Sequence, residues 1–238
     1  MSRGLREKVG ETVEALAVEG SDRLVVENSG SRRSSAERRE EILLVALSVL
    51  AERGYRGASM REIAGRARAS KETLYAWFGD KRGLFEELVG LQAERVDAAI
   101  TPSLDGEAAA APEVLRDFAI ELQKLLLGER SVVINRAAIS EATTDPTLAE
   151  ALAARGRESV VPKLVRYLEG QRERGVLEFD DPQTAVDALI GLTIGDQQVR
   201  RLLGVLPMPG PARIEARADR AVGAFLTLFA PPQNSRKA

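Results

Sequence analysis

One stretch of this chain, Ser59–Leu88, limits the possible folds more than any other part of the sequence. It begins with Ser-Met-Arg-Glu, a pattern typical of a helix start in which the Ser hydroxyl and the Glu carboxylate bind free backbone amides. Apolar residues then recur at helical spacing, at Met60, Ile63, Ala64 and Ala67. This spacing predicts a short amphipathic helix that buries one side.

Two further helices are expected within the same stretch. Ser70 is a candidate N-cap for a helix whose inward side carries Leu74 and Phe78. On that helix, Glu72 and Ala76 point away from the core, with Thr73 and Tyr75 on the flanks. Asp80 is a candidate cap for the third helix, which buries Leu84, Phe85 and Leu88. Two short helices joined by a tight turn form a helix-turn-helix, whose second helix can enter the major groove of DNA.

The local charge agrees with a surface that binds phosphate. From Arg53 to Arg82 there are eight Lys or Arg residues and three acidic residues, whereas the whole chain has a net charge of −2. A local excess of positive charge on a slightly acidic protein is typical of nucleic-acid binding.

The same residues resemble the DNA-binding domain of the TetR/AcrR transcriptional regulators. The resemblance runs over roughly Arg38 to Leu91 and rests on Ile63-Ala64, Ala67, Ser70 through Phe78, Lys81 and Leu84-Phe85. Two positions depart from the family's pattern, since Arg68 stands where the family usually has a turn glycine and Ala69 where it usually has valine. A residue with a Cβ at positive φ costs about 1 kcal/mol, so we expect a strained or slightly altered turn at Arg68.

The exposed face and the resemblance together give a set of candidate DNA contacts. The short polar side chains at the helix starts are expected to cap the helices and approach phosphate, and Lys71, Glu72 and Thr73 are candidates for reading base edges. The resemblance implies a phosphate contact for Lys81. The alternative for each residue is purely structural, as a cap, a solvated lysine or a partly buried aromatic ring. The predicted DNA-binding residues are Ser59, Arg61, Ser70, Lys71, Glu72, Thr73, Tyr75, Trp77 and Lys81.

Composition excludes several classes of function. The chain contains neither Cys nor His, which removes disulfides, zinc fingers and any His-based general base. There is no glycine-rich phosphate loop after a strand and no nucleophile elbow, so we expect no enzymatic activity, no cofactor and no metal site. No apolar run reaches the length of a membrane span and no signal core is present, so we expect a cytoplasmic protein.

We expect an all-α protein with four segments. Residues 1–34 form an N-terminal extension, either a mobile tail or a basic arm in which Arg32 and Arg33 reach a minor groove. Residues 35–91 form a three-helix DNA-binding domain, whose first helix runs from about Ala36 to Arg53 and ends at Gly54. Residues 92–230 form a helical regulatory and dimerisation domain, and the helix that leads into it is expected to break near Pro102. Residues 231–238 form a C-terminal tail.

Two C-terminal helices, about Thr184–Leu203 and Ile214–Phe229, look too apolar to be exposed on one side. The simplest partner for them is a second copy of the chain, which would give a two-fold four-helix interface. The predicted dimerisation residues are Ile190, Ile194, Gln197, Val222, Phe225 and Leu226.

The resemblance implies a small hydrophobic effector bound within the second domain. The predicted ligand-binding residues are Phe118, Leu122, Val133, Asn135, Arg136, Ser140, Leu164 and Leu189, although the same stripes would also suit a packed core without a pocket. The chain is therefore interpreted as a homodimeric repressor that leaves a palindromic DNA operator when the effector binds. The alternatives are a DNA-binding scaffold that recruits another protein through its C-terminal domain and an enzyme on a helical scaffold.

Overall fold

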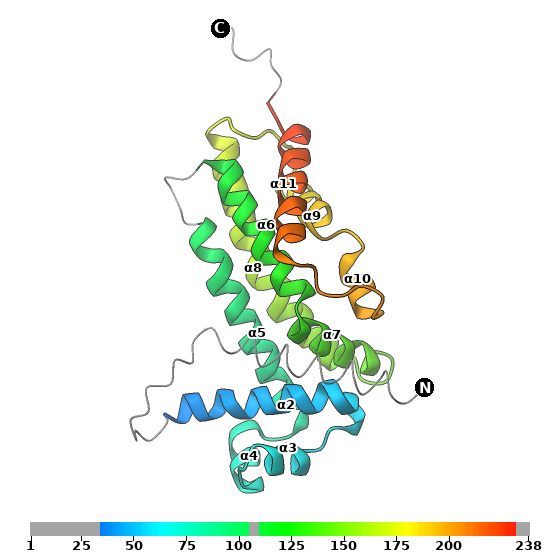
Figure 1. Ribbon diagram of the computed structural model, residues 1–238. Coiled ribbons are helices and arrows are strands. Elements are labelled where there is room, and N and C mark those ends of the chain that lie inside the picture. Colours follow the sequence, from blue (N-terminus) through cyan, green and yellow to red (C-terminus); the bar gives the residue numbers. More distant parts are fainter. Residues whose placement is uncertain (1–33, 105–109, 232–238) are drawn as a thin grey trace, which may run out of the picture. The chain divides into compact units, whose positions relative to one another are not determined.

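The computed structural model describes residues 34–104 and 110–231, and every regular element in these ranges is an α-helix (Figure 1). Residues 1–33, including the predicted helix at Leu5–Leu16 and the arm at Arg32 and Arg33, lie outside the described residues, as does the tail from 232 onward. The helices form two compact units, 1–91 with 129–152 and 92–128 with 153–238. The chain passes between the units three times: within α5, between α6 and α7, and within α8.

The N-terminal unit is built on α2, Ser35–Gly57. A complete capping box begins it: the Ser34 hydroxyl accepts from the Glu37 amide at 3.2 Å, and the Glu37 carboxylate accepts from the Ser34 amide at 2.8 Å. Gly54, at φ 67°, interrupts the helix where the sequence predicted its end, and a further turn of helix follows to Gly57.

Three helices pack on α2 within this unit: α3 (Met60–Arg66), α4 (Lys71–Phe78) and the first turns of α5 (Lys81–Leu104). The largest fully buried side chains here include Ile42, Ile63, Leu74, Leu84 and Phe85. Burial of each aliphatic or aromatic side chain contributes about 1.5–3 kcal/mol, which fixes the short helices that could not form alone. Gly83 allows α5 to start close to α4, because a Cβ there would overlap the carbonyl oxygen of Phe78.

A fourth helix, α7 (Glu129–Glu141), also belongs to the N-terminal unit. Its apolar side chains share one buried cluster with those of α2 to α5, and the members from α7 are Val133, Ile134, Ala137 and Ala138. The N-terminal unit combines residues 1–91 with residues 129–152, whereas the sequence analysis assigned residues 92–230 to a single second domain. The apolar stripe of α7 is therefore buried within the N-terminal unit.

The C-terminal unit contains α6 (Ala111–Leu127), the second part of α8 (Thr147–Glu173), α9 (Pro182–Ile194), α10 (Gln197–Leu202) and α11 (Pro211–Leu228). Its core is formed mainly by the inward faces of α6, α8, α9 and α11, with Phe118, Leu164, Leu168, Leu189 and Phe225 fully buried. Asp181 caps α9 and precedes Pro182 at the first helical position, as expected for an N-terminal proline.

Two helix bounds differ from the sequence prediction. The predicted helix Thr184–Leu203 is divided into α9 and α10, because Gly195 adopts φ 53° and ends α9. Helix α5 extends to Leu104 and so passes the break expected at Pro102, which lies in its last turn.

Candidate DNA-binding surface

Helix α4 presents the exposed face expected of a recognition helix. Leu74 and Phe78 are buried, whereas Lys71, Glu72 and Ala76 are exposed and Tyr75 is 53% exposed. Thr73 is half-buried, and its hydroxyl lies 3.0 Å from that of Ser70. Because the inward residues are locked in the core, the outward residues have a fixed position on the surface of the unit.

Serine caps start both helices of the helix-turn-helix. The Ser59 hydroxyl accepts from the Glu62 amide at 3.2 Å, and the Ser70 hydroxyl accepts from the Thr73 amide at 3.0 Å. The predicted reciprocal bond from Glu62 is not among those described, since its carboxylate faces Arg66 at 2.7 Å and Arg53 at 3.6 Å. A cation four residues along the helix competes with the amide for this carboxylate.

The turn between α3 and α4 carries the strain expected at the missing glycine. Arg68 has φ 49° and is the one non-Gly residue at positive φ among the described residues. Arg38 supports this turn from α2: its Nη2 donates to the Ala67 carbonyl at 2.5 Å and to the Arg68 carbonyl at 3.2 Å. A charged donor on two carbonyls offsets part of the strain energy, which is about 1 kcal/mol.

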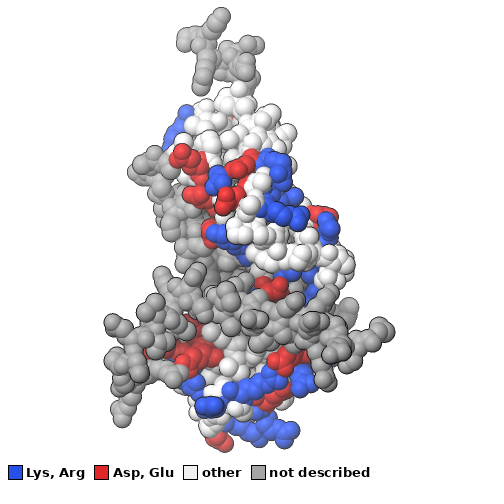
Figure 2. Space-filling view, viewed as in Figure 1, with Lys and Arg blue, Asp and Glu red and all other residues white. Residues whose placement is uncertain are grey.

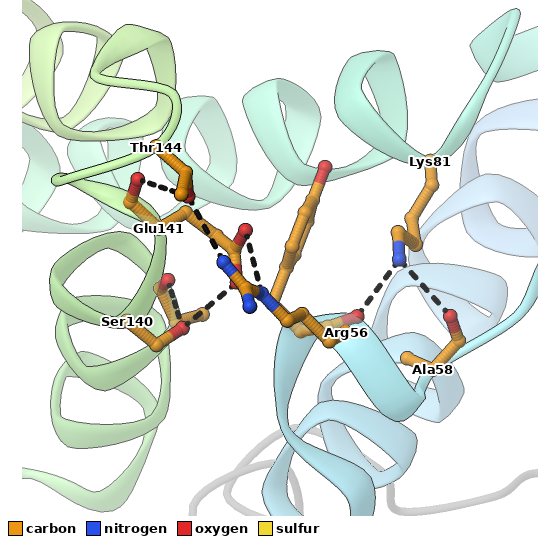
Figure 3. Close-up of polar contacts among 8 residues, drawn as sticks. Arg56, Ala58, Lys81, Ser140, Glu141 and Thr144 are labelled. Atoms are coloured by element: carbon orange, nitrogen blue, oxygen red, sulfur yellow. Dashed lines mark hydrogen bonds and ion pairs between the residues drawn. The ribbon is translucent and has the colours of Figure 1, made fainter.

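Trp77 and Lys81 are held more tightly by the protein than the sequence suggested. The Trp77 ring is half-buried, packs against the core and meets Phe78 edge to face at 6.3 Å, while its carbonyl accepts from Arg39 at 3.0 Å. The Lys81 ammonium donates to the carbonyls of Tyr55 at 2.9 Å and Ala58 at 3.2 Å, and lies 4.4 Å from the centre of the Tyr55 ring (Figure 3).

Ion pairs neutralise much of the positive charge counted in the sequence. Arg53, Arg56, Arg66 and Arg82 each face a carboxylate. Of the eight Lys and Arg residues from Arg53 to Arg82, three exposed ones have no ion-pair partner among the described residues, and all three belong to α3, the turn or the start of α4: Arg61, Arg68 and Lys71. Figure 2 shows Lys and Arg side chains gathered over the N-terminal unit. Arg68 was not among the DNA-binding residues predicted from the sequence. The signal that could have identified it was the arginine at a position where the family usually has a turn glycine.

Arg56 connects α2 to α7 within the N-terminal unit. Its Nε donates to both carboxylate oxygens of Glu141, at 2.9 and 3.2 Å, and its Nη2 donates to the Thr144 hydroxyl at 3.0 Å (Figure 3). Ser140 adds a contact of 3.4 Å to the same carboxylate. Arg56 and the two carbonyls that hold Lys81 belong to one short segment, 55–58, so α5 and α7 both position the link that leads into α3. No sequence signal joins residues 85 positions apart in this way.

Comparison with known proteins decides the family. Residues 42–88 match the family model described as bacterial regulatory proteins of the tetR family, and residues 113–231 match the C-terminal domain of AefR-like transcriptional repressors. The chain belongs to the TetR family of transcriptional regulators. Members of this family bind DNA and form dimers.

Solved TetR-family structures cover most of the chain. A regulator from Agrobacterium tumefaciens is 35% identical, with a TM-score of 0.67 over 83% of this chain and 96% of that one. A regulator from Mesorhizobium loti MAFF303099 is 29% identical, with a TM-score of 0.74 over 84% of this chain and all of that one. The flavonoid-responsive regulator FrrA is 29% identical, with a TM-score of 0.67 over 83% of this chain and all of that one.

A curated relative is the transcriptional activator FasR of Mycolicibacterium smegmatis, which is 35% identical over 75 residues. The match covers 32% of this chain and 34% of FasR, so the chain aligns with about a third of that relative's length. Among the described residues of this TetR-family chain, no helix is both long and apolar enough to span a membrane.

The predicted ligand-binding residues divide between the two units. Phe118, Leu122, Leu164 and Leu189 are buried together in the core of the C-terminal unit. The other four lie on α7: Val133 is buried in the N-terminal core, Asn135 donates to the Ser131 carbonyl at 2.8 Å, and Arg136 and Ser140 are exposed. The eight residues therefore do not line one core, because α7 directs its apolar side toward α2.

The predicted dimerisation residues also divide. Phe225, Val222 and Ile194 are buried in the core of a single chain, at 0%, 4% and 5% exposure. Their apolar character is explained by contacts within the C-terminal unit, which sequence periodicity alone cannot distinguish from an interface. Ile190, Leu226 and Gln197 are half-buried and remain partly accessible.

Proposed function

We propose that this TetR-family regulator is a homodimeric, cytoplasmic repressor that binds a palindromic operator and is released by a small apolar ligand. The observation that carries the DNA-binding part is the fixed, exposed face of α4 beside three cations without ion-pair partners among the described residues, Arg61, Arg68 and Lys71. Such charges favour phosphate binding and give it a strong dependence on salt. The matched description of AefR-like repressors supports repression.

The candidate residues would take two kinds of contact. Lys71, Glu72 and Thr73 reach base edges from the first turn of α4, while Ser59, Ser70 and Tyr75 approach phosphates at the helix starts and flank. An ammonium group has three N–H donors. Lys81 uses two of them on Tyr55 and Ala58, so it contacts phosphate through the third without leaving its place.

The ligand-responsive part rests on the apolar core of the C-terminal unit and on the relative FrrA, which is described as flavonoid-responsive. A ligand that binds one conformation better shifts the population toward it, and a coupling of about 1–3 kcal/mol changes operator affinity about 5- to 150-fold. The relative FasR is an activator, so a second candidate function is activation at the same operator. A reporter gene placed under the protein's operator distinguishes the two functions, because its expression falls with a repressor and rises with an activator.

The dimer is proposed to form through the accessible sides of α9 and α11. Replacement of Leu226 by Asp places a charge on this side without entering the fully buried position of Phe225. We expect the variant to sediment as a monomer. An unchanged sedimentation coefficient would place the dimer contact on other helices.

The decisive experiment is selection of random duplex DNA by the purified protein at about 150 mM salt, a concentration at which general phosphate binding is weakened. A recovered palindrome would establish sequence-specific regulation and give the half-site spacing. Tyr75→Ala should weaken binding to all sequences alike, and Lys81→Ala should also reduce the salt slope by about one per site. Arg82→Ala is the control, because Arg82 already pairs with Glu86.

Recovery of no preferred sequence, with only salt-sensitive general binding, would contradict the repressor proposal. That outcome would favour the DNA-binding scaffold, in which the C-terminal unit recruits another protein.

A further inference from the structure

The core of the C-terminal unit contains polar atoms that the fold does not use. Gln123 on α6 and Thr193 on α9 are both fully buried, at 0% exposure. The Gln123 Oε1 and the Thr193 Oγ1 have no hydrogen-bond partner among the described residues, and neither does the buried hydroxyl of Tyr167 on α8. Buried polar atoms in folded proteins are nearly always hydrogen-bonded, so each of these needs an explanation.

The orientation of the Gln123 amide follows from its neighbours. Its Nε2 donates to the carbonyls of Ala119 and Ile214, each at 3.1 Å. A flip of the amide would direct an oxygen at two carbonyl oxygens and lose both bonds, so the nitrogen must face them. The unused atom is therefore the oxygen, which can only accept a hydrogen bond.

Gln123 and Thr193 approach the same turn of α11. Gln123 binds the Ile214 carbonyl, and Arg217, three residues later, donates to the Thr193 carbonyl at 2.5 Å and the Leu192 carbonyl at 3.2 Å. The Gln123 side chain and the Thr193 backbone are thus both bonded to the first two turns of α11. Tyr167 packs against the same apolar cluster.

We propose that Gln123, Tyr167 and Thr193 are the polar anchors of the effector site, which takes a neutral, hydroxylated, largely apolar molecule of the polyphenol type. This inference rests on the proposed ligand response and specifies its chemistry. The amide oxygen requires a donor, and the two protein hydroxyls can each donate or accept, so ligand hydroxyl groups satisfy all three. The surrounding apolar side chains cover the body of the ligand.

The same geometry disfavours a carboxylate ligand such as a fatty acid. A carboxylate has no proton to donate to the Gln123 oxygen, and its charge would have to be buried in an apolar core. Arg217 already donates to helix-end carbonyls, and Arg201 donates to the carbonyls of Leu127 at 2.8 Å and Leu206 at 3.0 Å. Each guanidinium thus commits at least two of its five N–H donors to backbone carbonyls.

The test uses three substitutions that keep shape and remove the unused polar atom: Gln123→Met, Tyr167→Phe and Thr193→Val. Tyr167→Phe and Thr193→Val each leave the apolar packing in place and remove a buried hydroxyl without a partner, so the melting temperature of the free protein should stay equal or rise. Gln123→Met also removes the bonds from Nε2 to the Ala119 and Ile214 carbonyls, so the melting temperature of this variant should fall. Matched controls remove polar atoms that already have partners near the surface: Gln183→Met, which loses the bond to Asp187, and Thr227→Val, which loses the bond to the Gly223 carbonyl.

Thermal shift is measured with four probes: apigenin, naringenin, the trimethyl ether of apigenin, and palmitate. We expect at least one of the two hydroxylated flavonoids to raise the melting temperature of the full chain by roughly 5 °C at saturation, with little effect of the ether or palmitate. The shift should fall by half or more in each anchor variant and persist in both controls.

Three results would overturn the proposal. One is an equal or larger shift with palmitate or the ether, and another is no shift with either flavonoid. The third is an anchor variant that keeps the full flavonoid shift, or a hydroxyl variant, Tyr167→Phe or Thr193→Val, that melts several degrees lower without ligand. Release of the protein from its operator is measured separately. A flavonoid that binds through the three anchor residues but leaves the operator complex intact would support the binding site and contradict the proposed release.

Discussion

The two compact units differ in how many of their helix starts are capped by side chains, although both contain such caps, for example Ser59 in one unit and Asp181 in the other. In the N-terminal unit, Ser34, Ser59 and Ser70 cap their helices with side-chain hydrogen bonds, and most arginines face a carboxylate or a carbonyl. In the C-terminal unit, α6 and α11 start without a side-chain cap bond, and the core contains unpartnered polar atoms. Directional bonds fix geometry, whereas apolar contacts tolerate rearrangement.

This difference suits two tasks. A surface that reads DNA must hold its contacts within a fraction of an ångström, so its supporting side chains are bonded to one another. A unit that responds to a ligand needs two arrangements of similar free energy, which a core with few directional bonds allows. The following predictions test whether the N-terminal unit is in fact the more rigidly specified of the two.

The largest effect is expected for Gly83→Ala. The new methyl group would overlap the Phe78 carbonyl oxygen, so α5 must move away from α4, at a cost of about 3 kcal/mol. Urea denaturation measures the loss, and operator affinity should fall with it because α4 is displaced. Gly65→Ala is the control: nothing lies within 4 Å of its Cβ position, and a helical Ala should add about 0.5–1 kcal/mol. Equal stability of the two variants would show that the α4–α5 contact yields easily.

The second test asks whether α7 is part of the rigid unit. A double-mutant cycle with Arg56→Gln and Glu141→Gln should give a coupling energy of about 1 kcal/mol, since Arg56 is largely exposed and its pairing is screened by solvent. The cycle is measured by urea denaturation and by operator binding. The pair Arg82→Gln and Glu86→Gln, within one helix, is the control and should couple by only about 0.3–0.5 kcal/mol. A coupling near zero for the first pair would remove this link between α2 and α7.

The strained turn offers a smaller effect of opposite sign. Arg68→Gly should raise the free energy of unfolding by about 0.5 kcal/mol, because relief of positive φ exceeds the added entropy of the unfolded chain. Ala69→Gly, at a neighbouring residue outside positive φ, should lower it by a similar amount. Denaturation in urea compares the two. A loss of stability in Arg68→Gly would mean that the arginine side chain contributes more than its backbone costs.

The smallest effect concerns how the free energy of unfolding depends on pH through Glu52. Arg66 donates to both oxygens of Glu52, at 2.6 and 2.7 Å, and these bonds hold the pKa of that carboxyl below its ordinary value of 4.5. A carboxyl whose pKa is lowered by folding stabilises the protein above the unfolded value and loses this contribution as pH falls through the folded value. Glu52→Gln should therefore be less stable than the parent by about 0.5 kcal/mol at pH 7, and the difference should vanish near pH 3. A difference that is independent of pH would contradict a charge-based role.

Local features were predictable from the sequence, and contacts between distant residues were not. The caps at Ser59 and Ser70, the inward pair Leu74 and Phe78, and the strain at Arg68 all follow from residues a few positions apart. The all-helical fold and the TetR family followed from the same short-range patterns.

The features that could not be predicted depend on which helix packs against the apolar face of which other helix. An apolar stripe states that a face is buried but not against what, so Val133 was placed with a ligand and Phe225 with a second chain. Lys81 was predicted to contact phosphate. Its bonds to the carbonyls of Tyr55 and Ala58 could not be predicted, because nothing in the sequence shows that these carbonyls lie within its reach. The contact between Arg56 and Glu141 could not be inferred for the same reason.

The division of the chain has a practical consequence for engineered regulators. A chimera that joins this DNA-reading head to a foreign sensor at residue 91 would leave behind α7, and with it Val133, Ile134, Ala137 and Ala138 of the head's own core. The head is encoded in two separate pieces of sequence, 1–91 and 129–152. A graft that exchanges specificity between relatives must carry both pieces, because residues 92–128 of the C-terminal unit are in effect an insertion within the head.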